Sequence, residues 1–310
     1  MRYNSDSKAR KVPQCKMGEV YMENKTGIYV PLITPFLENG EVDYAGLEKA
    51  TKFVLAKGVD GIYALGGSAE FTLLSVEERK RCLECILASS GEKEVIVQVG
   101  SQSTRDSLEL AEHAAAAGAT MLSAVAPYYF GYDFSQIQTY FKQIAHATDL
   151  PLMIYNAAQA RSYTLDEMRA LLQDEKIRSV KYTGYNFYFL ERLITEYRDK
   201  KFYTGADEAF LAGQAVGAHG AIGTTYNYFA DRYVQIRKLF LQGENQAALD
   251  IVRKVNGVTQ TLIASNSMLA ATKYVMTLQG LDILPISRAP FTPLSEDYKR
   301  ELKASYERSL

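Results

Sequence analysis

Short apolar runs alternate with longer amphipathic stretches along most of the chain. Eight such runs begin near Gly27, Gly61, Glu94, Thr120, Pro151, Arg178, Lys201 and Gly220. Their brevity and their β-branched residues predict strands that are buried on both faces, as in a parallel sheet. The intervening segments, such as DYAGLEKATKFVLAKG and SLELAEHAAAAGA, have helical periodicity and end at a glycine, which is a common helix stop.

This alternation of strand and helix predicts parallel βα units and therefore an α/β fold. Eight units at roughly even spacing favour a closed (β/α)₈ TIM barrel over an open doubly wound sheet. No G-x-G-x-x-G follows the first run, so the main sign of a dinucleotide-binding fold is missing. After the eighth run, from about Ala230 onward, the pattern predicts helices only. We expect a barrel over residues 26–240 and a C-terminal helical extension over residues 241–310.

The first 25 residues are polar and mixed in charge, without the apolar core of a secretory signal. We interpret residues 1–25 as a flexible or loosely docked extension. A transit peptide is the alternative, which Asp6, Glu19 and Glu23 disfavour. No run of 18 or more apolar residues occurs, so we expect no membrane span and a cytoplasmic protein.

Composition excludes several other classes of function. The formal net charge is −1 and the charges are interspersed, which argues against a nucleic-acid partner. Cys82 and Cys85 form a C-x-x-C, but the spacing of VEERKRCLECILASS predicts a helix with buried cysteines rather than a redox or zinc pair. Neither a second C-x-x-C nor an H-x-x-x-H accompanies them, so we expect no metal site.

Lys181 is the main candidate for chemistry. Catalytic residues of such barrels lie at the carboxyl ends of the strands, and Lys181 ends the buried run RSVKYT. Partial burial there favours the uncharged amine, which can attack a carbonyl carbon. The resulting imine would withdraw electrons, so that a C–C bond two atoms away can break or form. A strand-end lysine that merely extends into solvent is the simpler interpretation.

Other strand ends carry weaker candidates. Tyr155 and Tyr129 can transfer protons, although tyrosine is a weak base and most of the 22 tyrosines should be packing residues. Residues 66–69 offer backbone N–H groups that suit a carboxylate, although a Gly-Gly-Ser sequence is usually only a loop. Asp207 and Glu208 can bind sugar hydroxyls, but an exposed acidic loop is the commoner explanation.

Taken together, these motifs resemble the family of N-acetylneuraminate lyase and dihydrodipicolinate synthase over about residues 26–307. PLITPF, G-x-x-x-E at 66–70, PYY at 127–129, YN at 155–156 and K-x-T at 181–183 follow the order and spacing of that family. The resemblance implies that Lys181 forms a Schiff base with a 2-keto acid such as pyruvate, without metal or organic cofactor. It makes Tyr155 the proton-handling tyrosine. It places Tyr129 in a neighbouring subunit's site, within a homotetramer built as a dimer of dimers.

The second half of the chain is more similar to N-acetylneuraminate lyase, because GADE at 205–208 and GTTYN at 223–227 match its motifs. The residues that this likeness assigns to the hydroxylated tail of a sugar acid are Gly205, Asp207, Glu208, Thr183, Gly223 and Thr224. Dihydrodipicolinate synthase has an arginine five residues after the YN tyrosine. That position is Ala160 here, and Arg161 is adjacent.

Three positions depart from the lyase pattern. Gly67 stands where the family has a hydroxyl residue that relays protons with the tyrosines, while Ser68 keeps the second hydroxyl. Gly67 and Ser68 remain the expected carboxylate-binding residues. Ala69 replaces a glycine of the same loop, and Leu269 stands where sialic acid lyases tend to have an aromatic residue.

The leading prediction is an aldolase that cleaves a sugar-derived 2-keto acid, with N-acetylneuraminate as first candidate, to pyruvate and an aldehyde. A dihydrodipicolinate synthase-like condensation is one alternative. A keto-deoxy sugar acid aldolase or dehydratase is another, because dehydratases of the family resemble the Gly-Gly form of the loop. A non-catalytic protein that binds a keto acid is the third. Gly67 motivates it, whereas Lys181, Tyr155 and the GADE motif argue against it.

Overall fold

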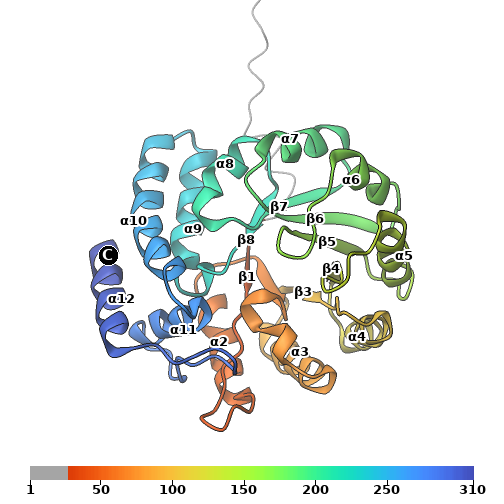
Figure 1. The fold of residues 1–310 in the computed structure, drawn as a ribbon. Coiled ribbons are helices and arrows are strands. Elements are labelled where there is room, and N and C mark those ends of the chain that lie inside the picture. The colour runs from red at the N-terminus through yellow and green to blue at the C-terminus, as the bar shows by residue number, and fades with distance from the viewer. Residues whose placement is uncertain (1–26) are drawn as a thin grey trace, which may run out of the picture.

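Eight parallel strands close into a barrel in chain order in the computed structural model, which describes residues 27–310 (Figure 1). The strands are β1 (Ile28–Pro31), β2 (Gly61–Ala64), β3 (Glu94–Gln98), β4 (Met121–Val125), β5 (Leu152–Ala157), β6 (Ile177–Thr183), β7 (Lys201–Thr204) and β8 (Gly220–Ile222). The predicted (β/α)₈ barrel and all eight strand positions are confirmed. The expected extension over residues 1–25 lies outside the described residues.

An α-helix follows each strand and covers the outside of the barrel (Figure 1). These helices are α2 (Tyr44–Leu55), α3 (Val76–Ser90), α4 (Thr104–Ala117), α5 (Phe134–Ala145), α6 (Leu165–Leu172), α7 (Phe187–Glu196), α8 (Phe210–Ala215) and α9 (Tyr226–Leu241). Helices α2 to α7 are each preceded by a residue whose side chain accepts a backbone N–H of the first turn, whereas α8 and α9 lack such a cap. Helix α3, for example, begins with a capping box in which Ser75 and Glu78 satisfy each other's backbone N–H groups.

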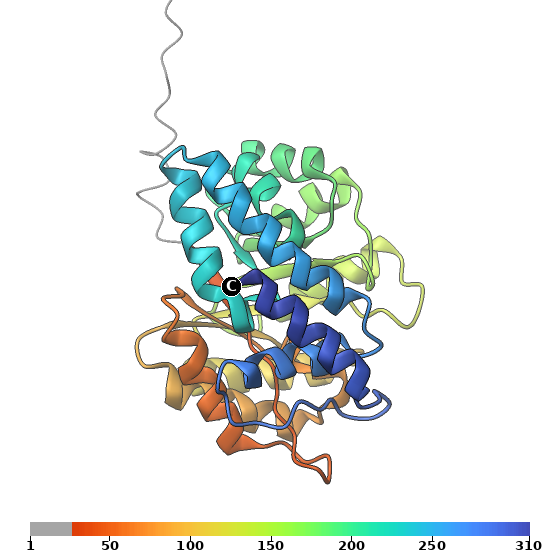
Figure 2. The same ribbon diagram turned by 90° about the vertical axis from the view of Figure 1, so that its left-hand side faces the viewer.

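Only α-helices follow the barrel, as predicted: α10 (Asn245–Ile263), α11 (Met268–Leu278) and α12 (Glu296–Ser309). Helix α10 packs on α9, and α12 packs on α10 and α11. Figure 2 shows these helices side by side on one flank of the barrel. The division of the chain at residue 240 stays a prediction, and α9 ends one residue beyond it, at Leu241.

Alternate residues of the strands fill the barrel interior. One buried cluster consists of Tyr29, Tyr63, Ile96, Met153, Tyr203 and Ile222. Successive strand side chains point to opposite faces, so Ile62 and Ala64, which flank Tyr63, instead join the main core between strands and helices. Tyr29 meets Tyr203 edge-on and donates its hydroxyl to Glu94, which closes the amino end of the interior.

Cys82 and Cys85 lie on α3, as predicted, and burial raises the pKa of the Cys82 thiol to about 12. A thiol with that pKa stays protonated and unreactive near neutral pH. Within residues 27–310, no group of three or more His, Cys, Asp or Glu side chains is arranged to hold a metal ion. No helix in this described part is long and apolar enough to cross a membrane.

A buried ion pair joins the loop after β2 to helix α11. The Nζ of Lys273 lies 2.7 Å from Oε1 of Glu70, and both side chains are 0% exposed. The other carboxylate oxygen accepts the backbone N–H of Arg288 at 2.9 Å, and Lys273 also donates to the carbonyl of Ile286 at 2.7 Å. Glu70 has a φ of 58°, which is uncommon for a residue with a side chain, so these contacts hold an unusual turn in place.

We expect Lys273→Met to lower the free energy of unfolding by about 3–5 kcal/mol, because it leaves the Glu70 carboxylate buried without its counter-charge. Urea denaturation at neutral pH measures this loss. Adding Glu70→Gln should restore part of the stability, since the double variant buries no charge at this position. A double variant no more stable than Lys273→Met alone would contradict the ion-pair explanation.

Candidate active site

Lys181 lies at the carboxyl end of β6 and is only 4% exposed, so the interpretation of a solvent-extended lysine is wrong. Its amine lies against two aromatic rings. The Nζ is 4.2 Å from the ring centroid of Tyr155 and 4.5 Å from that of Tyr63. Strands β5 and β6 pair with Tyr155 directly beside Lys181. Of the three residues that the resemblance assigns to catalysis, Lys181 and Tyr155 are therefore brought together.

Tyr63 is a neighbour of Lys181 that the sequence analysis missed. It lies on β2, is 0% exposed, and meets the Tyr155 ring edge-on at 6.1 Å. Its hydroxyl is 2.9 Å from Oγ of Ser123 on β4. The period of two in GIYAL places Tyr63 and Ile62 on opposite faces, but the strand alone does not reveal which face is the barrel interior.

The expected carboxylate loop lies at the same end of the barrel. Its residues form a 3₁₀ turn, η1 (Gly67–Ala69). Oγ of the buried Ser68 is 2.8 Å from Oγ1 of Thr224, which links the loops after β2 and β8. Gly67 is exposed, its φ lies outside the left-handed region, and a Cβ there would meet no atom within 4 Å. The site therefore has room for a side chain at residue 67.

Two glycines allow the loops after β7 and β8 to pack tightly against polar side chains of the site. A Cβ at Gly205 would overlap Oγ1 of Thr183 and lie 3.2 Å from Cε of Lys181. A Cβ at Gly223 would overlap Oδ1 of Asp207. Neither position can accept a side chain without displacing a neighbouring polar group, which explains the glycines of the GADE and GTTYN motifs.

Asp207 is 6% exposed, so the interpretation of an exposed acidic loop is wrong for this residue. Its Oδ2 accepts both the backbone N–H and the hydroxyl of Thr225 at 2.7 Å. Its Oδ1 and the Oγ1 of Thr183 are buried and have no hydrogen-bond partner among the described residues. Such groups are normally satisfied, so these two atoms are suited to hydroxyl groups of a ligand. Burial raises the pKa of Asp207 to about 6.

Glu208 is half-buried beside Asp207 on η3 (Asp207–Ala209). Its carboxylate accepts the hydroxyl of Tyr185 from the loop after β6. Its backbone carbonyl accepts the side-chain amide of Asn256 on α10 at 3.0 Å. The sequence analysis did not identify Tyr185 or Asn256, because neither belongs to a motif and both are remote from Glu208 in the chain.

Tyr129 is not part of this cluster within the described chain. It lies on the loop between β4 and α5, is 79% exposed, and meets Phe130 edge-on at 4.9 Å. Its backbone N–H donates to Oε1 of Gln102 at 3.1 Å. The hydroxyl therefore remains available to another molecule.

Arg161 is already engaged by the chain itself. One guanidinium nitrogen donates to the carbonyl of Tyr132 at 2.9 Å, and another donates to Glu167 at 2.8 Å. In dihydrodipicolinate synthase, the arginine of this region holds a second carboxylate of the substrate. A guanidinium paired as in Arg161 is poorly placed for that task, which disfavours the dihydrodipicolinate synthase-like alternative.

Leu269 lies half-buried in the first turn of α11. It is one helical turn before Lys273, and residues four apart share a helix face. It therefore lies on the side of α11 that faces Glu70 and the carboxylate loop.

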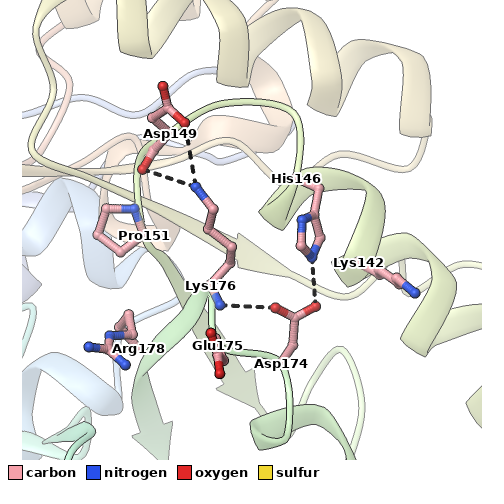
Figure 3. Close-up of a pocket in the computed structure, with 8 residues that line it drawn as sticks. All are labelled: Lys142, His146, Asp149, Pro151, Asp174, Glu175, Lys176 and Arg178. Carbon is pink, nitrogen blue, oxygen red and sulfur yellow. Dashed lines mark hydrogen bonds and ion pairs between the residues drawn. The ribbon is translucent and has the colours of Figure 1, made fainter.

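A surface pocket of 720 Å³ lies at the opposite end of β5 and β6 (Figure 3). Four of its charged or titratable side chains form two pairs across it. His146 is 3.0 Å from Asp174, and Lys176 is 3.6 Å from Asp149. These residues precede the strands, whereas barrel active sites lie at the carboxyl ends. The candidate active site is therefore the group of residues around Lys181.

The structure thus defines the class of protein, which is a (β/α)₈ barrel with a buried lysine at the end of its sixth strand. The chain belongs to the dihydrodipicolinate synthetase family, whose model matches residues 24–308. The predicted family is confirmed.

Several similar proteins within the family are named N-acetylneuraminate lyase. N-acetylneuraminate lyase of Rhizobium meliloti (strain 1021) is 36% identical over 272 residues, which are 87% of this chain and 90% of the relative. CdNal from Clostridium difficile in complex with mannosamine has a TM-score of 0.89 and 30% identity, covering 92% of this chain and 99% of that one. N-acetylneuraminate lyase from Fusobacterium nucleatum complexed with pyruvate has a TM-score of 0.87 and 31% identity, covering 94% and 98%.

The raised pKa of Asp207 predicts how its contribution to stability depends on pH. A shift from 3.8 to about 6 makes the folded protein bind a proton more tightly than the unfolded chain. The stabilisation from this tighter proton binding is fully present at pH values below the pKa of Asp207 in the unfolded chain. It is lost as the pH rises through about 6. Two pKa units correspond to about 3 kcal/mol. The free energy of unfolding of Asp207→Asn, relative to that of wild type, should therefore rise by up to about 3 kcal/mol as the pH increases from about 4 to about 7. Urea unfolding across this window tests it, and a pH-independent difference would contradict the shift.

Proposed function

We propose that this chain is a class I aldolase that cleaves a sugar-derived 2-keto acid to pyruvate and an aldehyde through a Schiff base on Lys181. The buried amine of Lys181 beside Tyr155, at the carboxyl end of the barrel, carries the proposal. The similarity to N-acetylneuraminate lyases supports N-acetylneuraminate as the substrate, with N-acetylmannosamine as the aldehyde product.

The reaction begins when the uncharged amine of Lys181 attacks the keto carbon C2. Loss of water and addition of a proton leave a C2=N⁺ iminium. The C3–C4 bond then breaks, and its electron pair forms a C2=C3 double bond while the C=N pair moves onto nitrogen. The proton of the C4 hydroxyl leaves, so that C4 becomes the aldehyde. Protonation at C3 and hydrolysis release pyruvate and regenerate the amine. The imine serves as the electron sink, so this scheme needs no other cofactor.

Tyr155 is the acid–base residue in this scheme. It accepts the proton of the C4 hydroxyl and returns a proton at C3. Ser68, the open position at Gly67 and the backbone amides of η1 receive the substrate carboxylate. The residues assigned to the hydroxylated tail are Thr183, Gly205, Asp207, Glu208, Gly223 and Thr224. The unpaired buried atoms of Thr183 and Asp207 support this assignment.

A homotetramer, built as a dimer of dimers, is part of the proposal, with Tyr129 reaching a neighbouring subunit's site. Tyr128, Tyr129 and Phe130 are 42%, 79% and 65% exposed. An exposed aromatic run of this kind is typical of a protein–protein interface, which supports the assembly. A cytoplasmic location is likewise proposed.

Incubation with pyruvate and borohydride should add one reduced pyruvate adduct to the peptide that contains Lys181. Hydride converts the C=N bond to a stable amine, so mass spectrometry can locate it. Lys181→Ala should remove the adduct. Tyr155→Phe should still form it, while pyruvate release from N-acetylneuraminate falls by about 10²–10⁴-fold, the usual contribution of a positioned acid or base.

A panel of 2-keto acids then identifies the substrate. It should include N-acetylneuraminate and keto-deoxy sugar acids, each assayed by pyruvate release with and without EDTA. A wild-type protein that never forms the borohydride adduct would end the Schiff-base proposal. Adduct formation without pyruvate release from any member would favour the non-catalytic keto-acid-binding alternative.

Gly67→Ser tests whether the missing hydroxyl distinguishes substrates. The structure leaves space for the added atoms, so the change should not strain the fold. We expect higher activity on N-acetylneuraminate if the restored hydroxyl relays protons to Tyr155. We expect lower activity if a keto-deoxy sugar acid places its own group in that space. The gain should be smaller than the 10²–10⁴-fold typical of a complete acid or base, because a relay residue only assists one.

Gly67→Ala is the matched control, because it adds Cβ without the hydroxyl. Equal behaviour of the Ser and Ala variants on every keto acid would show that the hydroxyl is irrelevant to the relay. Circular dichroism and the urea midpoint of both variants check that the fold is unchanged.

A further inference from the structure

Tyr63 has no role in the scheme above, yet its ring touches the reacting nitrogen. The centroid of Tyr63 lies 4.5 Å from Nζ of Lys181, within the range of a cation–π contact. The Tyr155 ring lies 4.2 Å from the same atom, and the two rings are inclined at 78°. Aromatic faces therefore border the amine on two sides, from β2 and from β5.

A positive charge at this position has little access to water, since Lys181 is 4% exposed and Tyr63 is 0% exposed. The negative face of an aromatic ring attracts a cation, and the attraction grows when water is excluded. In the proposed reaction, the nitrogen is neutral when it attacks, positive in the iminium, and neutral again in the enamine. A ring face beside the nitrogen therefore favours the charged species over the neutral ones, which is the differential stabilisation that catalysis requires.

We propose that Tyr63 is a further catalytic residue, whose ring face stabilises the protonated imine on Lys181. The proposal rests on the Schiff-base function. Tyr63 forms and breaks no covalent bond and transfers no proton. The imine takes its proton from water or Tyr155, and the C3–C4 electron pair ends in the enamine as before. The contribution of Tyr63 is to raise the fraction of imine that carries the proton and can accept that pair.

The hydroxyl of Tyr63 is engaged elsewhere. It lies 2.9 Å from Oγ of Ser123, and burial raises the pKa of Tyr63 well above its ordinary value. A phenol in this state is a poor proton donor. The aromatic face is thus the part of Tyr63 that acts on the nitrogen, and this separates its role from that of Tyr155.

Other titratable groups also face the nitrogen and must be separated from Tyr63. Tyr155 approaches from β5. Tyr203 on β7 is the register partner of Lys181 and points into the interior. Its side chain forms a hydrogen bond with Tyr29. Asp207 on η3 interacts electrostatically with Lys181 and favours a cation there too. Asp207→Asn is therefore a necessary companion variant.

The experiment measures how fast cyanoborohydride traps the pyruvate adduct at pH values from mildly acidic to mildly alkaline. This reagent reduces the protonated imine, so the pH profile reports protonation directly. Tyr63→Phe keeps the ring face and should keep the wild-type pH profile. Tyr63→Leu removes the face and should slow trapping by about 5- to 30-fold at neutral pH, the effect expected of a desolvated cation–π contact. It should also shift the falling limb of the profile by about one pH unit toward acid.

Tyr63→Met provides a second ring-free variant that fills more of the cavity left by tyrosine. Leu and Met variants that share the acid shift support the proposal, because a packing defect alone does not move the protonation profile. Wild-type profiles in both would overturn it, as would a Phe variant that behaves like Leu. A wild-type pH profile in Asp207→Asn would show that the rings dominate the stabilisation of the charge. If the profile shifts in Asp207→Asn but not in Tyr63→Leu, the charge effect belongs to Asp207 and the proposal is overturned. Failure of the wild type to trap pyruvate would instead overturn the Schiff-base function.

Discussion

Closure of the strands into a barrel is the constraint on which the rest of the site depends. Once β8 pairs with β1, each strand presents every second side chain to a space that water hardly enters. The pairing of β5 with β6 then places Tyr155 beside Lys181, and β2 adds Tyr63 across the interior. A lysine held this way meets aromatic faces in place of solvent. The same closure that stabilises the fold thus creates an environment where an imine can carry charge without being hydrated.

The C-terminal extension supports two of the loops that surround this interior. Lys273 on α11 reaches Glu70, which ends the carboxylate loop, and Asn256 on α10 reaches the backbone of Glu208. Ser68 and Thr224 join the loops after β2 and β8 directly. In the proposed function, helices α10 and α11 therefore act at a distance on substrate binding. They hold the loops from which the proposed binding groups project, which is how a scaffold keeps a site preorganised.

The sequence was sufficient for the strands, because each is a short apolar run between turn residues and amphipathic helices. It also placed Lys181 at the end of a buried run, and the structure confirms that position, whereas the catalytic role of Lys181 stays a prediction. It could not reveal the partners of Glu70 or Lys181. Lys273 is 203 residues from Glu70, and Tyr63 on β2 is separated from Lys181 on β6 by the three strands β3, β4 and β5. Side-chain contacts across a closed barrel depend on register and inward orientation, which local periodicity does not encode. The burial of Asp207 was missed for the same reason, since an acidic pair in a loop has no periodic signature.

The site is chemically divided, and the division bears on the substrate. Around the nitrogen the walls are aromatic, formed by the buried Tyr63 and the partly buried Tyr155. Around the proposed tail they offer polar atoms without partners, at Thr183 and Asp207. Leaving such atoms buried is unfavourable unless a ligand satisfies them. In the proposed function, the tail region would therefore favour a hydroxylated substrate over one that lacks hydroxyls. Gly67 lies in neither region but at the open edge of the carboxylate loop. In the proposed function, the absent hydroxyl changes the space next to the carboxylate and removes a group that would relay protons to Tyr155. Gly67 therefore bears both on which keto acid is accepted and on how fast it is cleaved.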